Sequence, residues 1–286
     1  MNRKLSLMGY LMSAPYIIYF IIFSAFPIFF SFFLIFHRWN IVGPMKWVGL
    51  ANFNMMFSDP LFWTSIYNTI IFLLIHIPLQ VVVALVLAEV LNQKIKARAF
   101  FRAAFFMPVV VSGVVVTILW KQLYSTDTGL LNNLLMAIGF GKVEWLTSTA
   151  MAMPSIALMA TWKNVGLYMI LFLAGLQSVP AYMYEAADID GATTLQKFRY
   201  ITIPAINPVI IMVLILSTIG GFSLFIEPYV MTGGGPLNST LSTVLYIYRQ
   251  GFSFYKMGYA ATLGFMLAAI IFVVVLIQRK LIEQDD

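Results

Sequence analysis

Cysteine is absent from this 286-residue chain, and charged residues make up only 10% of it. Without cysteine the chain can hold no disulfide, no thiolate metal site and no cysteine nucleophile. A soluble domain carries roughly a quarter charged residues, so this low share, beside 61% hydrophobic residues, excludes a water-soluble fold. The sequence also has no Gly-x-x-x-x-Gly-Lys-[Ser/Thr] loop, and so lacks that means of cradling the phosphates of ATP.

The hydrophobic residues gather in six long stretches, near residues 10–36, 61–90, 103–123, 150–176, 204–226 and 258–278. A helix of about 20 residues crosses the roughly 30 Å hydrocarbon core of a bilayer. The stretches therefore predict an all-α fold, a polytopic bundle of six transmembrane helices that spans residues 1–286 as a single domain. Six helices are few for a complete transporter built from paired repeats, so we expect a second membrane subunit.

The basic residues indicate the orientation of these helices, because cytoplasmic loops retain more lysine and arginine. The segments on the N-terminal side hold ten of them: Arg3, Lys4, Lys94, Lys96, Arg98, Arg102, Lys197, Arg199, Arg279 and Lys280. The opposite segments hold six: Arg38, Lys46, Lys121, Lys142, Arg249 and Lys256. This bias predicts that both termini lie in the cytoplasm. Because the basic residues lie between membrane spans, the partner they indicate is the lipid bilayer, and no nucleic acid is expected.

The segment 180–203, between the fourth and fifth stretches, has the pattern of an ordered element. From Glu185 to Asp190 it predicts a short helix with acids near its positive end, two alanines that allow close approach, and Gly191 placed to end it. The alternative is an amphipathic connector lying on the membrane surface, but three acids suit an anionic inner leaflet poorly. We therefore expect this helix to dock on a partner protein.

The same segment reads Glu-Ala-Ala, three residues, Gly, nine residues, Ile, one residue, an aliphatic residue and Pro. These are Glu185-Ala186-Ala187, Gly191, Ile201, Ile203 and Pro204. The pattern resembles the signature of binding-protein-dependent ABC importer permeases, with Ile203 in place of the usual leucine. Its extended form, Asp190-Gly191-Ala192 with Phe198 and Pro208, resembles the carbohydrate branch, that is, maltose-type and related oligosaccharide or glycerol-phosphate permeases.

This resemblance implies a type I ABC importer permease fold in a prokaryotic cell membrane, and a chain that is a transport subunit rather than an enzyme. The partners it implies are a second homologous permease, two ATP-binding subunits that hold ATP and Mg²⁺, and an extracytoplasmic solute-binding protein. It also implies a coupling helix that seats on the ATPase. The residues that the resemblance places in this coupling role are Tyr184, Glu185, Ala186, Ala187, Asp188, Asp190, Gly191, Ala192 and Pro204.

Residues inside the fourth and fifth stretches are candidates for a sugar pathway. Lys163 falls in the middle of its stretch, where a charge costs about 2.5–3.5 kcal/mol on insertion scales. It would donate either to sugar hydroxyls or to a carbonyl of a neighbouring helix, and the sequence leaves both readings open. The full candidate set is Trp162, Lys163, Asn164, Phe222, Phe225 and Glu227. Since Lys163 is the one cation on this path, an oligosaccharide is preferred over glycerol 3-phosphate.

Metal binding and other classes of protein find less support. His76 has no second ligand at metal spacing, so we predict a helix-packing hydrogen bond for it and no metal site. A membrane enzyme would need a catalytic pair, and Glu89, Lys163 and Glu227 form none by their spacing. An ion-coupled carrier or channel remains an alternative, which flux without any ATPase subunit would favour.

Overall fold

The computed structural model describes residues 3–93 and 95–282, so Lys94, one of the basic residues counted above, lies outside the described residues. Five helices are long and apolar enough to cross a membrane, or six if one bent pair counts as a single span. This confirms the all-α class. The chain divides into two compact units, one of Met1–Phe62 with Ile247–Ala268, the other of Trp63–Tyr246 with Ala269–Asp286.

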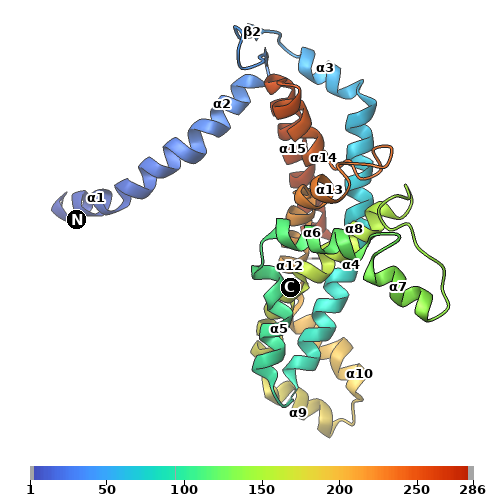
Figure 1. Ribbon diagram of the computed structural model, residues 1–286. Helices are drawn as coiled ribbons and strands as arrows, with labels where there is room; N and C mark the ends of the chain where they lie inside the picture. The colour runs from blue at the N-terminus through green and yellow to red at the C-terminus, as the bar shows by residue number, and fades with distance from the viewer. Residues whose placement is uncertain (1–2, 94, 283–286) are drawn as a thin grey trace. The chain divides into compact units, whose positions relative to one another are not determined.

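The first unit begins with an apolar helix that is exposed along most of its length. Helix α1 (Arg3–Phe20), the π-helical η1 (Ile21–Ala25) and α2 (Phe26–Leu34) follow one another without a break, in blue in Figure 1. The antiparallel strands β1 (His37–Arg38) and β2 (Lys46–Trp47), helix α3 (Ala51–Phe57) and the start of α4 (Pro60–Asn92) come next. The C-terminal part of the chain adds the end of α14 (Thr243–Tyr248), η3 (Arg249–Ser253) and the first part of α15 (Met257–Ile282).

Two close contacts hold the hairpin of this unit in place. The Asn52 side chain, buried on α3, donates from Nδ2 to the carbonyls of Ile35 (2.8 Å) and His37 (3.0 Å). At the start of α15, a Cβ on Gly258 would collide with the His37 carbonyl, so only glycine lets these backbones meet. The hairpin, α3 and the start of α15 are therefore fixed against one another.

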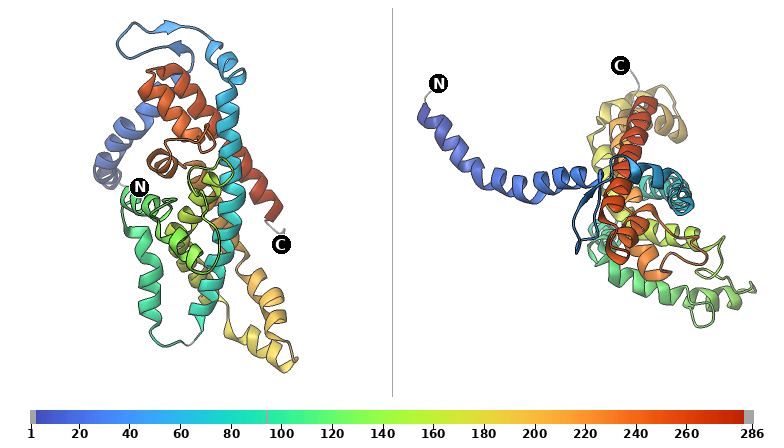
Figure 2. Two further views of the ribbon diagram at one scale, coloured as in Figure 1. Left: turned by 45° about the vertical axis from the view of Figure 1, so that its right-hand side comes forward. Right: turned by 90° about the horizontal axis from the view of Figure 1, so that it is seen from above.

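The second unit contains the remaining helices. They are α5 (Arg98–Val110), α6 (Gly113–Leu123), α7 (Leu130–Ala137), α8 (Ala152–Ser178), α9 (Ala181–Ile189), α10 (Thr194–Lys197), η2 (Phe198–Thr202), α11 (Ile203–Ala205), α12 (Asn207–Phe222) and α13 (Ile226–Met231). Most of α4 and the end of α15 also belong to it. Figures 1 and 2 show α9 and α10 together at one end of this unit, the same end at which α4 finishes and α5 begins.

Helix α8 is the centre of the second unit. In the 18-residue apolar window of α8, 61% of the residues are buried. The corresponding share is 28% in α4 and 33% in α12–α13. Small residues make this possible: Ala84 and Ala88 of α4 lie in one buried cluster with Phe172 of α8, and a Cβ on Gly166 would collide with the Phe105 carbonyl of α5. A helix apolar on all sides suits such a central position.

Two of the predicted helices are interrupted. Residues 103–123 were expected to form one helix, but α5 and α6 meet at 96°, because Val111 and Ser112 adopt extended backbone angles between them. Residues 204–226 divide likewise: α12 ends at Phe222 and α13 starts at Ile226. Average hydropathy does not register such breaks, since a few extended residues leave the apolar composition of a stretch unchanged.

Candidate functional site

A cavity of about 410 Å³ lies within the second unit, at the level of the middle of α4 and α8 and the end of α12. Its polar lining groups are side chains from four helices or their ends: His76, Asn164, Tyr168, Ser217, Ser223 and Glu227. Phe72 and Phe225 add aromatic surface. No lysine or arginine is among its lining residues in the described part of the chain.

His76 is held by a short chain of hydrogen bonds to α8. Its Nδ1 lies 2.8 Å from the Thr161 hydroxyl, and that hydroxyl donates to the Ala157 carbonyl at 2.8 Å. Because the hydroxyl hydrogen is used in this way, Nδ1 is the donor to Thr161, and a neutral ring keeps Nε2 as an acceptor. The packing bond predicted for His76 therefore exists, and the same residue lines the cavity.

A second group of polar side chains comes from three of the helices around the cavity. The Ser217 hydroxyl donates to Oε1 of Gln80 at 3.1 Å, and Tyr168 of α8 lines the same cavity as Ser217. Gln80 is fully buried, yet its Nε2 has no partner within the described residues. Uncompensated polar groups are costly in a hydrocarbon environment, so this cluster marks α4, α8 and α12 as helices that surround a polar space.

The structure brings together some of the predicted pathway residues. Asn164, Phe225 and Glu227 line the cavity, and Glu227 is 9% exposed. The ring of Phe225 stacks on that of Tyr229, with the two ring centroids 5.3 Å apart. Phe222 is buried beside the cavity without lining it.

Trp162 and Lys163 lie elsewhere. The ring centroids of Trp162 and Trp120 lie 5.3 Å apart. Trp162 also lines a separate, mostly apolar cavity with Pro108. The ammonium group of Lys163 lies against Gly113, where α6 begins, and a Cβ built on that glycine would be 3.0 Å from Nζ. Lys163 is thus placed at the break between α5 and α6 rather than on the cavity wall.

The segment after α8 forms the short helix expected from its sequence. Helix α9 ends with the Gly191 amide donating to the Asp188 carbonyl (3.1 Å) and the Ala192 amide donating to the Ala187 carbonyl (2.9 Å). Gly191 has φ +73°. This is a Schellman ending, which requires a left-handed residue after the helix. A residue that tolerates the left-handed region is thus needed at the position where the sequence predicted the helix to stop, and glycine does so without strain.

Further contacts tie α9 to the chain that follows it. The Tyr184 hydroxyl lies 2.9 Å from that of Thr202, and Lys197 pairs with Asp188 at 2.6 Å. Thr193 and Gln196 form a reciprocal capping box at the start of α10. Pro204 lies in α11, just before the start of α12.

The exposed surface of α9 and α10 carries both polar and large apolar side chains. Glu185, Ala186 and Asp190 are exposed. Ile189 is 88% exposed and Leu195 74% exposed. Large apolar side chains so open to solvent at a projecting tip suit an interface with another molecule.

The end of α8, which leads into α9, is anchored on α5. With its amide oxygen turned toward α5, Gln177 accepts hydrogen bonds from Arg102 at 3.0 Å and from Arg98. Only Val179 and Pro180 separate α8 from α9. A displacement of α9 would therefore act directly on the ends of α8 and α5.

A helical membrane bundle with a polar mid-span cavity and a short projecting helix has the build of a transport protein's membrane subunit. Residues 9–283 match the family described as "Binding-protein-dependent transport system inner membrane component". The chain belongs to this family, which confirms the resemblance seen in the sequence. It is a permease subunit of an ABC transporter, in which the ATPase is a separate subunit.

Curated relatives and a solved structure cover almost the whole chain. The arabinooligosaccharides transport system permease protein AraP of Bacillus subtilis is 38% identical over 95% of this chain and 87% of its own. The lactose transport system permease protein LacF of Rhizobium radiobacter is 38% identical over 97% and 95%. A chain of a bacterial alginate ABC transporter, crystallised in complex with an alginate pentasaccharide-bound periplasmic protein, superposes with a TM-score of 0.83 at 26% identity, covering 99% of this chain and 98% of that one.

The described residues contain no group of three or more histidine, aspartate or glutamate side chains that could hold a metal ion.

Proposed function

We propose that this chain forms one half of the translocation pathway of an ATP-driven importer for a sugar, most favourably a neutral oligosaccharide. The observation that carries the proposal is the cavity between α4, α8 and α12. Its hydroxyl, amide, imidazole and carboxylate groups are hydrogen-bonding partners for sugar hydroxyls, and its two phenylalanine rings provide apolar faces for a pyranose ring.

The charge of the cavity supports a neutral sugar over glycerol 3-phosphate. Glu227 is the one charged residue among its described lining residues, and a carboxylate would repel a phosphate group in a site of low dielectric constant. The relatives named for arabinooligosaccharides and lactose favour the same substrate class. Lys163 lies outside the cavity wall, at the α5–α6 break, where it would respond to movement of these helices.

Energy would enter through the projecting segment α9–α10. In this proposal residues 184–192 seat in the ATPase subunit, with Glu185, Ala186, Asp190 and Gly191 at the contact, and Pro204 transmits the movement to α12. Two ATP-binding subunits hold ATP and Mg²⁺, and this chain holds neither. To invert a 1:99 population of two conformations takes about 5.5 kcal/mol of differential binding, which ATP-driven closure of the partner would supply through α9.

The proposed assembly also fixes the topology. With both termini in the cytoplasm, the α9–α10 segment faces the ATPase subunits, and the β1–β2 hairpin and the η3–α15 junction lie outside. A second homologous permease completes the pathway, and an extracytoplasmic solute-binding protein delivers the sugar. The neighbour crystallised with its periplasmic protein supports this arrangement.

Uptake by the purified complex in proteoliposomes tests the proposal. With binding protein outside and ATP inside, labelled lactose or arabino-oligosaccharides should accumulate, and labelled glycerol 3-phosphate should not. Accumulation of glycerol 3-phosphate alone would replace the sugar assignment. Sugar flux that persists without ATP and without the ATPase subunits would instead favour an ion-coupled carrier or channel.

A further inference from the structure

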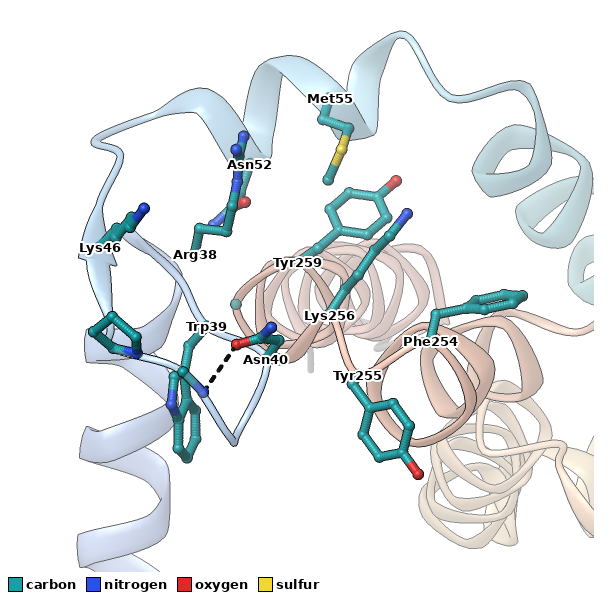
Figure 3. Close-up of a pocket in the computed structure, with 13 residues that line it drawn as sticks. Arg38, Trp39, Asn40, Lys46, Asn52, Met55, Phe254, Tyr255, Lys256 and Tyr259 are labelled. Carbon is teal, nitrogen blue, oxygen red and sulfur yellow. Dashed lines mark hydrogen bonds between the residues drawn. The ribbon is translucent and has the colours of Figure 1, made fainter.

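A second large cavity, of about 570 Å³, lies in the first unit. Figure 3 shows its two walls: Arg38, Trp39, Asn40 and Lys46 come from the β1–β2 hairpin, and Phe254, Tyr255, Lys256 and Tyr259 come from the η3–α15 junction. Asn52 and Met55 of α3 close one end. The walls are fixed against each other by Asn52 and Gly258, as described above, so the cavity is a formed feature.

The lining of this cavity carries three positive charges and no negative one. Arg38, Lys46 and Lys256 are exposed, and none of them takes part in the ion pairs found among the described residues. The sequence of the two segments that build this unit, 1–62 and 247–268, contains a single acid, Asp59. Its carboxylate is already engaged, by the Tyr259 hydroxyl at 2.6 Å and the Leu61 amide at 2.9 Å.

Unpaired like charges held around one cavity repel each other and attract an anionic partner. The cavity is built from the loops beyond the helix ends, including Gly43 and Pro44, a level that protein partners and lipid headgroups both reach. The topology in the proposed function places both loops outside the cell. The chain's family depends on a binding protein, which must meet the permease on that side.

We infer that this cavity, formed by the hairpin and the η3–α15 junction, is a docking site for an acidic surface segment of the solute-binding protein. The aspartate or glutamate carboxylates of that segment would enter between Arg38, Lys46 and Lys256, and the aromatic walls would pack on its backbone and methylene groups. The inference rests on the proposed function, because it needs a binding protein on this face.

The test measures the affinity of the fluorescently labelled binding protein, the one that co-purifies with the complex, for complexes in phosphatidylcholine nanodiscs. The variant R38Q/K46Q/K256Q should weaken binding about tenfold and flatten its dependence on NaCl concentration, because fewer charges remain to be screened. R38K/K46R/K256R should bind like the wild type. Lys142→Gln is the matched control, since Lys142 is also predicted to lie outside but pairs with Asp127 at 2.9 Å; it should leave the affinity unchanged.

The inference would be overturned if R38Q/K46Q/K256Q bound the binding protein with the same affinity and the same salt dependence as the wild type. So would an equal loss in Lys142→Gln, which would mean that general surface charge steers the binding protein. If the triple variant keeps its affinity but loses phosphatidylglycerol that co-purifies with the wild type, the cavity is a lipid headgroup site. If the triple variant fails to assemble, the single variants Lys46→Gln and Lys256→Gln decide, each with an expected loss of about twofold. Failure of the proposed function looks different, because no binding protein would then associate with the wild type at all.

Discussion

Replacing Gly191 with valine should uncouple ATP hydrolysis from transport. Gly191 has φ +73°, a region that costs a residue with a Cβ roughly 1–2 kcal/mol, and more if it is β-branched. No atom lies within 4 Å of a Cβ built there, so within this chain the cost comes from the backbone and not from a collision. The helix end would then lose its two closing hydrogen bonds, from the amides of Gly191 and Ala192, in a large part of the population.

Since 1.4 kcal/mol is tenfold in an equilibrium constant, a loss of 1–2 kcal/mol should lower sugar uptake per ATP hydrolysed about 5- to 30-fold. The assay is uptake and phosphate release measured on the same proteoliposomes. Gly191→Asn is the matched control, because asparagine tolerates the left-handed region better than other residues, and it should keep at least half of the wild-type ratio. A valine variant with the wild-type ratio would refute the assignment of residues 184–192 as the coupling helix.

Three further substitutions test the pathway and the packing. Glu227→Gln should raise the KM for sugar about tenfold to a hundredfold with assembly intact, because a hydrogen bond to a charged group is worth about 1.5–3 kcal/mol; an unchanged KM would remove Glu227 from the substrate path. Lys163→Met should change the transport rate or affinity about tenfold without loss of assembly, and unchanged kinetics would make Lys163 structural. Gly166→Ala should destabilise the chain by about 1–3 kcal/mol, visible as a lower melting temperature in detergent, because its Cβ would meet the Phe105 carbonyl. Gly220→Ala is its control, since the nearest atom to that Cβ is the Tyr168 hydroxyl at 3.9 Å, and equal melting temperatures for the two variants would contradict this packing argument.

The spans, the short helix α9 and its glycine ending could be predicted from the sequence, because each depends on local chemistry. Hydropathy over about 20 residues identifies a span, and an acid-rich turn closed by Gly191 identifies a helix end. The break at Val111 and Ser112 depends on two extended residues with unremarkable side chains, so average hydropathy could not reveal it.

The cavity was predicted in part, and helix geometry explains which part. Successive residues of an α-helix differ by about 100° around its axis. Trp162 and Asn164 therefore face roughly opposite sides of α8, and only Asn164 reaches the cavity. Tyr168 lies four residues after Asn164 on the same face and lines the cavity too. Following that i, i+4 spacing from Asn164 would have found it.

Ser217 could not have been found in this way, because its role depends on contacts between helices. It meets Gln80 of α4, 137 residues away in the sequence. His76 was predicted to make a packing hydrogen bond, and it does so with Thr161, but its place in the cavity wall depends on how α4 and α8 cross.

The measurement that tests the central claim most directly is co-purification of this chain from native membranes in mild detergent, with identification of the associated proteins. The account predicts recovery of an ATPase and a second multi-helix permease, and uptake that requires ATP and a binding protein once the complex is reconstituted. Recovery of this chain alone, active in transport without ATP, would contradict it.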